Sequence, residues 1–335
     1  MMPAAIVLGL LPVLCFLAAL YLLDSFNLVR VRQIVLAIAV GFAAAFLSMA
    51  INSYLLQTFA IELKFYSRYF APVVEETLKA GYLVYLIRAH KTGFAVDSAI
   101  HGFAVGAGFA LVENLYYLAT LAQAPLLVWL VRGFGTAMMH GGVSAIFAIV
   151  AKNLFARQAG KPIRPFLLAG LLAIGLHSFF NHFLLPPLQT TLLLLAALPV
   201  LILLVFQRSE QATRAWLGVG LDTDAELLEL LESGKLSDSR VGHYLSVLKT
   251  RFRGEVVADM LCLLRLQVEL AMRAKGILLM RENGFPIKPD PAIAAKLAEV
   301  DYLQKSIGKT GLLAIAPLLH SESKDVWQLR LLARG

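Results

Sequence analysis

The sequence predicts an all-α protein: a polytopic membrane helical bundle of about seven transmembrane helices, followed by a C-terminal helical cytoplasmic domain. Of its 335 residues, 59% are hydrophobic and only 16% are charged, whereas about a quarter of the residues are charged in a soluble domain. Residues 1–206 hold 12 lysines and arginines and 6 acidic residues, and residues 207–335 hold the other 18 and 16. We therefore divide the chain into a transmembrane domain, 1–206, and a charged domain, 207–335.

Seven apolar segments are long enough to cross a bilayer, whose core of about 30 Å requires about 20 residues of helix. They are 4–23, 34–56, 70–87, 96–119, 126–150, 166–185 and 190–206. No basic residue precedes the first segment, so we interpret it as a retained span and not as a signal peptide. Between the last two segments, Pro186 and Pro187 suit a tight turn.

The short loops predict the orientation of the chain, because lysine and arginine are retained on the cytoplasmic side. If the N-terminus is outside, the outer loops hold only Lys64 and Arg68. The inner loops then hold Arg30, Arg32, Arg88, Lys91, Lys152, Arg157, Lys161 and Arg164. We therefore expect the N-terminus to lie outside and domain 207–335 to lie in the cytoplasm.

Domain 207–335 has the pattern of amphipathic helices, the longest from about 255 to 282 and another from about 292 to 305. We find no catalytic motif in it and interpret it as a regulatory or docking domain that binds a cytoplasmic partner. Basic residues retained in loops explain the high isoelectric point of the chain. Because the domain has no basic stripe, we expect no nucleic acid among its partners.

Three acidic residues are predicted inside spans: Glu75, Glu76 and Glu113. A charged carboxylate near the bilayer centre costs at least a few kcal/mol, so each is a candidate functional residue. Glu75 lies four residues before Lys79, the better orientation for a helical ion pair, whereas Glu76 points about 100° away. We therefore expect Lys79 to pair with Glu75 and to leave Glu76 free as a general base.

Two later spans add imidazoles and an amide to these carboxylates. His140 lies in the fifth span, and His177 and Asn181 lie one turn apart on one face of the sixth. In the predicted topology these residues and the three glutamates lie in the outer half of the membrane, with His140 somewhat deeper. The spacings by themselves indicate a polar cluster within the membrane.

The residue types in this cluster suit peptide hydrolysis. Two histidines and a carboxylate can hold a divalent metal, of which Zn²⁺ is the one we expect. We predict Glu113, His140 and His177 as the ligands. A nearby glutamate would take the proton of a metal-bound water, and Asn181 could donate a hydrogen bond to the tetrahedral oxyanion.

The order of the motifs resembles that of a known family. Pro72-Val-Val-Glu75-Glu76-x-x-Lys79, Gly106-x-Gly108-Phe109-x-x-x-Glu113-Asn114, His140 and His177-x-x-x-Asn181 follow one another on four consecutive spans between residues 70 and 185. In this order they resemble the PrsW family of intramembrane proteases, which is related to the CAAX prenyl protease and bacteriocin-processing superfamily.

The resemblance implies a protease in the inner (cytoplasmic) membrane of a bacterium. PrsW-like proteins are associated with the first cleavage of membrane-anchored anti-sigma factors on the extracytoplasmic side, during stress signalling. The resemblance places the family's functional residues on Glu75, Glu76, Glu113, His140, His177 and Asn181. The superfamily is usually classed with metalloproteases, although a metal-free scheme with a glutamate and a histidine has been argued for relatives.

Three alternatives to a PrsW-like protease remain. A proton-coupled transporter or channel also uses intramembrane Glu and His residues, but we find no clear internal repeat of the transporter kind. An inactive scaffold could act through its cytoplasmic tail, although the motif set is intact. A CAAX-type prenyl protease is disfavoured, because Glu113 stands where those relatives have a histidine and because prenylated substrates are cytosolic.

Overall fold

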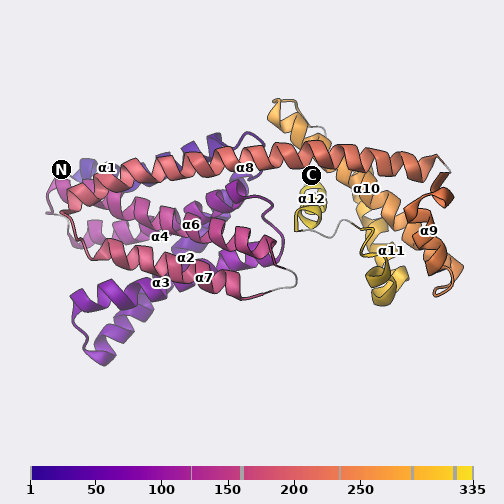
Figure 1. Cartoon of the computed structure of the whole chain (residues 1–335). Coiled ribbons are helices and arrows are strands. Elements are labelled where there is room, and N and C mark those ends of the chain that lie inside the picture. Colours follow the sequence, from indigo (N-terminus) through magenta and orange to yellow (C-terminus); the bar gives the residue numbers. More distant parts are fainter. Residues whose placement is uncertain are drawn as a thin grey trace. The chain divides into compact units, whose positions relative to one another are not determined.

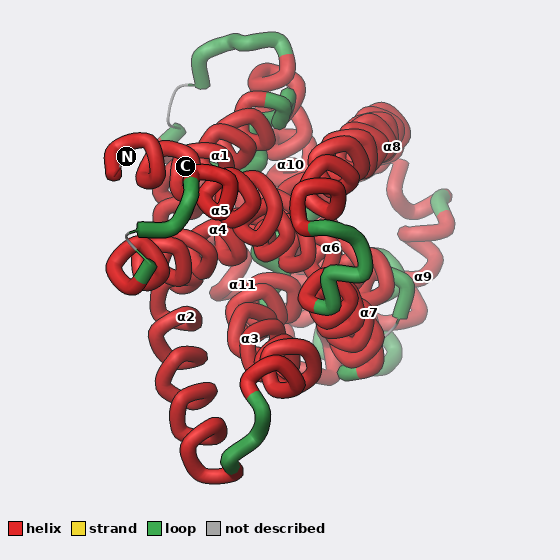
Figure 2. The backbone as a smooth tube through the Cα atoms, turned by 90° about the vertical axis from the view of Figure 1, so that its left-hand side faces the viewer, coloured by secondary structure: helices red, strands yellow, loops and turns green. Residues whose placement is uncertain are grey.

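The computed structural model describes residues 2–121, 123–158, 162–233, 235–287, 290–319 and 323–333. Within these ranges every regular element is a helix and no strand occurs, as Figure 2 shows. The predicted all-α membrane bundle is therefore confirmed. The chain divides into two compact units, Met1–Glu210 and Gln211–Gly335. Lys161, counted above among the inner basic residues, lies outside the described residues.

The first unit has a helix at each of the seven predicted spans (Figure 1). In chain order they are α1 (Met2–Leu22), α2 (Val31–Phe59), α3 (Leu63–Arg88), α4 (Ala95–Thr120), α5 (Leu126–Val131) with the π-helix η1 (Arg132–Thr136) and α6 (Ala137–Ala156), α7 (Arg164–Asn181) and α8 (Pro187–Glu232). The segments α5, η1 and α6 together form one continuous helix of 31 residues.

Five of these helices are long and apolar enough to cross a membrane: α1, α2, α4, the continuous helix Leu126–Ala156 and α8. The other two, α3 and α7, do not meet that measure among the described residues. Both contain the charged and polar side chains singled out above, such as Glu75 and His177, which lower their mean hydropathy. They nevertheless pack against each other and against α6, so the bundle itself shields their polar side chains.

Helix α4 forms the centre of the first unit. In its apolar stretch of 18 residues 94% of the residues are buried, compared with 28% in the corresponding stretch of α1 and 33% in that of α2. Its glycines allow this close packing. A Cβ atom at Gly106 would lie 2.8 Å from the Cα of Gly141 on α6, and one at Gly108 would lie 2.9 Å from the Cα of Ile38 on α2. Such distances leave no room for a side chain, as expected where small residues let helices approach in lipid.

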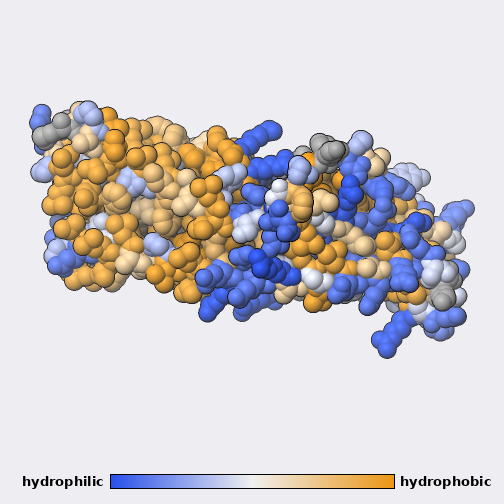
Figure 3. Space-filling view, turned by 90° about the horizontal axis from the view of Figure 1, so that it is seen from above, coloured by the Kyte–Doolittle hydropathy of each residue, from blue (hydrophilic) through white to orange (hydrophobic). Residues whose placement is uncertain are grey.

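The outward faces of the first unit are apolar, and Figure 3 shows hydrophobic side chains covering its visible face. Leu36 and Phe46 of α2, Leu171 of α7 and Leu193 of α8 are each more than half exposed. Large exposed apolar surface is costly in water but not in lipid. The surface therefore fits the predicted position in a bilayer.

In the part of the second unit that the structure describes, the end of α8 is followed by four further α-helices: α9 (Arg240–Leu248), α10 (Gly254–Glu282), α11 (Pro291–Ile315) and α12 (Ser323–Ala333). Leu263, Leu270 and Ala274 of α10 form its core together with Leu303 and Ile307 of α11. The helices predicted at about 255–282 and 292–305 are present. In α11 a kink at Gly308, whose φ is 70°, follows the predicted segment and precedes further helical residues up to Ile315. The assignment of a regulatory role to this unit stays a prediction.

Candidate active site

The predicted site residues gather around one cavity of about 420 Å³ in the first unit. It is lined by Glu75 of α3, Glu113 of α4, His140 of α6, and His177 and Asn181 of α7. The sixth predicted residue, Glu76, is buried beside this cavity, with 4% of its surface exposed. Four helices thus bring all six side chains together within the bundle.

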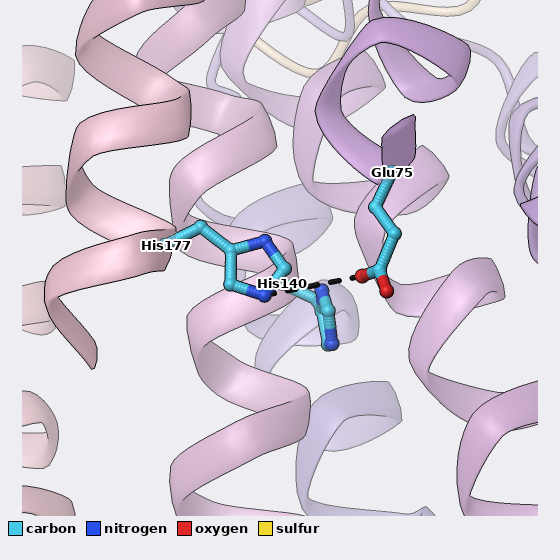
Figure 4. Close-up of side chains that lie close together, drawn as sticks. All are labelled: Glu75, His140 and His177. Carbon is cyan, nitrogen blue, oxygen red and sulfur yellow. Dashed lines mark ion pairs between the residues drawn. The ribbon is translucent and has the colours of Figure 1, made fainter. Parts of the chain in front are cut away.

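Glu75, His140 and His177 converge most closely, as Figure 4 shows. Each offers one ligand atom, and these atoms lie within 4.8 Å of one another. The Nε2 atom of His177 is 3.9 Å from Oε2 of Glu75, and the two imidazole rings stand almost perpendicular, with centroids 4.9 Å apart. Two imidazoles and one carboxylate beside an open cavity are the donor set of a catalytic divalent metal site.

Glu76 holds the other side of His177. Its Oε1 atom lies 2.7 Å from Nδ1 of His177, which leaves Nε2 turned toward Glu75. A carboxylate on the second ring nitrogen commonly orients a metal-binding histidine. The buried Nζ atom of Lys79 lies 2.5 Å from the same Glu76 oxygen, so Glu76 is a paired, orienting carboxylate.

This arrangement corrects the predicted roles of the two neighbouring glutamates. Lys79 pairs with Glu76 and not with Glu75, so the expectation of a free Glu76 is wrong. Residues three and four apart can both meet on a helix, and sequence spacing therefore does not choose between them. The bundle chooses, because Glu76 faces the buried His177 while the Glu75 side chain, 15% exposed, opens into the cavity.

Glu113 is also placed differently from the prediction. Its Oε2 atom lies 3.1 Å from Nε2 of His140, and its Oε1 atom lies 3.4 Å from Nη2 of Arg132. Among the described residues, Glu75 and not the predicted Glu113 lies with His140 and His177 in the group that could hold a metal ion. The physical reason is Arg132, whose charge holds the Glu113 carboxylate on the other side of His140.

His140 contacts a charged group through each ring nitrogen. Its Nδ1 atom lies 3.2 Å from Nζ of Lys79, and a lysine ammonium can only donate. Nδ1 is then the acceptor, and a neutral ring carries its proton on Nε2, where it donates to Glu113. Binding a metal ion requires His140 to exchange one of these two partners for the ion.

Two polar groups at the cavity were missed in the sequence. Arg132 donates from Nε to Oδ1 of Asn114 at 2.9 Å, and its guanidinium lies 3.6 Å from the ring centroid of Tyr117. Asn52 donates from Nδ2 to Glu75 at 3.4 Å. A charge or an amide within an apolar span was the available signal for both.

Asn181 lies at the rim of the same cavity. Its Nδ2 atom donates to the backbone oxygen of Ser67 at 2.9 Å, and Ser178 Oγ donates to the backbone oxygen of Arg68 at 2.7 Å. These bonds join the end of α7 to the beginning of α3. Because an amide has two N–H groups, the predicted oxyanion role of Asn181 remains open to it.

Comparison with known proteins agrees with this geometry. The family model of the PrsW family intramembrane metalloprotease matches residues 30–206, which is more than half of the chain and includes every residue named around the cavity. No curated protein and no solved structure matches the chain. The match confirms the predicted intramembrane protease. The chain belongs to the PrsW family of intramembrane metalloproteases.

Proposed function

We propose that this protease hydrolyses peptide bonds of membrane-anchored proteins near the extracytoplasmic surface, and that Glu75, His140 and His177 hold a Zn²⁺ ion for the reaction. The convergence of these three ligand atoms within 4.8 Å at the wall of an open cavity is the observation that supports it. When bound, such an ion lowers the pKa of its water to near neutrality and polarises the scissile carbonyl.

The remaining residues have separate tasks in this proposal. Glu113 reaches the cavity with 27% of its side chain exposed and accepts the proton of the attacking water. Glu76 keeps Nε2 of His177 directed toward Glu75 through its 2.7 Å contact with Nδ1. Asn181 donates its second N–H group to the tetrahedral oxyanion.

The location of the cavity supports cleavage on the extracytoplasmic side. Its lining comes from the end of α2, the beginning of α3 and the ends of α4 and α7. In the predicted topology all of these ends are outside. A membrane-anchored anti-sigma factor in bacterial stress signalling is the substrate class that the family resemblance suggests.

A comparison of native membranes tests this function. Membranes with the wild-type protein should contain extracytoplasmic fragments of particular single-pass proteins, identified by mass spectrometry, that are missing with Glu75→Gln or His177→Ala. His182→Gln is the matched control, because His182 follows the cavity residue Asn181 but does not line the cavity itself. Its ring contacts the backbone oxygen of Ser178 and the hydroxyl of Tyr69. This variant should leave the fragments unchanged.

Metal analysis of the same purified proteins tests the zinc assignment. The wild type should retain about one zinc ion per chain, as a three-ligand catalytic site does, and His177→Ala should lose it. Fragments produced by a wild-type protein that retains no metal would favour the metal-free scheme. Unchanged fragments with both site variants would contradict the proposed function itself.

A further inference from the structure

A second cavity, of about 340 Å³, lies between α6, α7 and α8 of the first unit. We call it the α8 groove. Its lining is apolar except for Thr190, and the hydroxyl of Thr190 already donates to the backbone oxygens of Leu185 and Pro186. The groove therefore has the surface chemistry of a site for hydrocarbon groups.

The lining residues follow the surface of three helices with helical spacing. On α7 and just past its end they occur at positions i, i+3, i+4 and i+7. They are Leu176, Phe179, Phe180 and Phe183. The lining residues of α6, starting from Met139, and of α8, starting from Thr190, have the same spacing. Each stripe is about 10 Å long at 1.5 Å per residue, so the groove offers two helical turns of apolar surface on three sides.

The α8 groove adjoins the catalytic cavity. Phe183 lines both of them. On α6, Met139 lines the groove and the next residue, His140, lines the catalytic cavity. The backbone of Phe183 has a φ of 45°, a left-handed conformation that is unusual for an aromatic residue. This conformation places one side chain at the boundary between an apolar and a polar space.

One wall of the groove is only lightly packed. In the apolar stretch of 18 residues in α8, 17% of the residues are buried, compared with 78% in that of the helix Leu126–Ala156. Its close approaches are at glycines: Thr191 lies against Gly135, and Leu198 lies against Gly142. Few side chains in this part of α8 are therefore buried against the rest of the first unit.

We propose that the α8 groove receives the transmembrane helix of the substrate, which enters from the bilayer between α7 and α8. This inference rests on the proposed function, since a membrane-anchored substrate approaches the bundle from lipid. A helix places apolar residues at i, i+3, i+4 and i+7 into such grooves, and the apolar lining of the α8 groove suits that face of a transmembrane helix. The polypeptide chain of the substrate then continues past Phe183 into the catalytic cavity. A lipid acyl chain has no polar group that this cavity would bind.

Photolabelling of the protein in liposomes tests the occupant of the groove. The probe is a synthetic single-pass helix of about 20 leucine and alanine residues with a diazirine at its centre. Ala197 of α8 lines the groove, and the adjacent Ala196 does not; both are exposed. Ala197→Trp should remove the label from the groove residues, and Ala196→Trp should leave it as in the wild type.

A phospholipid with the same diazirine in one acyl chain forms the second arm. The proposal is overturned if the peptide labels the outer faces of α1 and α2 as strongly as the groove, or if Ala197→Trp retains the label. It is also overturned if only the phospholipid labels the groove. Melting temperatures of both variants show whether they are folded. Labelling needs no cleavage, so the His177→Ala protein should be labelled like the wild type even if the proposed function fails.

Discussion

At the scale of the residue, the site is a connected set of charged and polar contacts. Arg132 contacts Glu113, Glu113 contacts His140, and His140 contacts Lys79. Lys79 then contacts Glu76, which bonds His177. Buried charges are tolerated only when they are paired, and this set pairs each charged member with another. Removing one charged member therefore leaves the buried charge of its neighbour unpaired.

Glu76 and Glu75 should differ in their effects on stability. Glu76→Gln leaves the ammonium of Lys79, 1% exposed, without its counter-charge, and breaking a buried pair costs about 3–5 kcal/mol. Glu75→Gln leaves no cation at hydrogen-bond distance unpaired, because the bond of Glu75 is with the amide of Asn52. Melting in detergent micelles should therefore show a much larger loss for Glu76→Gln.

The double variant Glu76→Gln/Lys79→Met provides the control for that measurement. It removes both charges, so it should recover part of the melting temperature lost by Glu76→Gln alone. An equal loss for Glu75→Gln and Glu76→Gln, with no recovery in the double variant, would show that the ion pair does not contribute as the geometry indicates.

Much of the site could be predicted at the residue scale because ionisable side chains are rare in membrane spans. The high cost of burying Glu75, Glu76 and Glu113 in lipid made them recognisable one by one. Their partners were less accessible to prediction, since Lys79 can reach either neighbour along α3. The choice depends on His177, which lies 101 residues after Glu76 in the sequence.

At the scale of the element, the packing of α4 against α6 sets the distance between Glu113 and His140. Gly106 on α4 faces the backbone of His140, and a Cβ atom there would lie 2.6 Å from the carbonyl carbon of His140. Glu113 lies two turns further along the same helix. The position of His140 relative to Glu113 therefore depends on the missing side chain at Gly106.

Gly106→Ala should abolish cleavage, because α4 and α6 must separate and the 3.1 Å contact between Glu113 and His140 must lengthen. Gly175→Ala on α7 is the matched control, since a Cβ atom there meets nothing within 4 Å. It lies two residues before His177 and should retain activity. Cleavage of the substrate in liposomes measures both, and an active Gly106→Ala protein would contradict this account of the packing.

Helix ends and helix irregularities were harder to predict than the helices. The sixth span was predicted to end at 185, but α7 ends at Asn181, because Phe183 adopts a left-handed φ ahead of Pro186. The π-helix Arg132–Thr136 was not predicted. Hydropathy does not register a change in backbone hydrogen bonding, although such π-helical turns often occur at functional sites.

At the scale of the whole molecule, α8 departs most from the predicted organisation. The span predicted at 190–206 is part of a continuous helix of 46 residues that ends at Glu232. The predicted boundary at 206 therefore falls inside a helix. The charge distribution predicts a change from lipid to water near residue 206, and a change of solvent does not by itself end a helix.

The orientation in the membrane can be tested with the two free cysteines, Cys15 and Cys262. In a Cys15→Ser protein, an impermeant maleimide added to intact spheroplasts should not label Cys262 until the membrane is opened, because the second unit is predicted to be cytoplasmic. A protein with both cysteines replaced by serine and with Lys64→Cys, in the first turn of α3, should be labelled at once. Since the cavity is lined by the helix ends near Lys64, the opposite labelling pattern would place the active site on the cytoplasmic side and exclude extracytoplasmic cleavage.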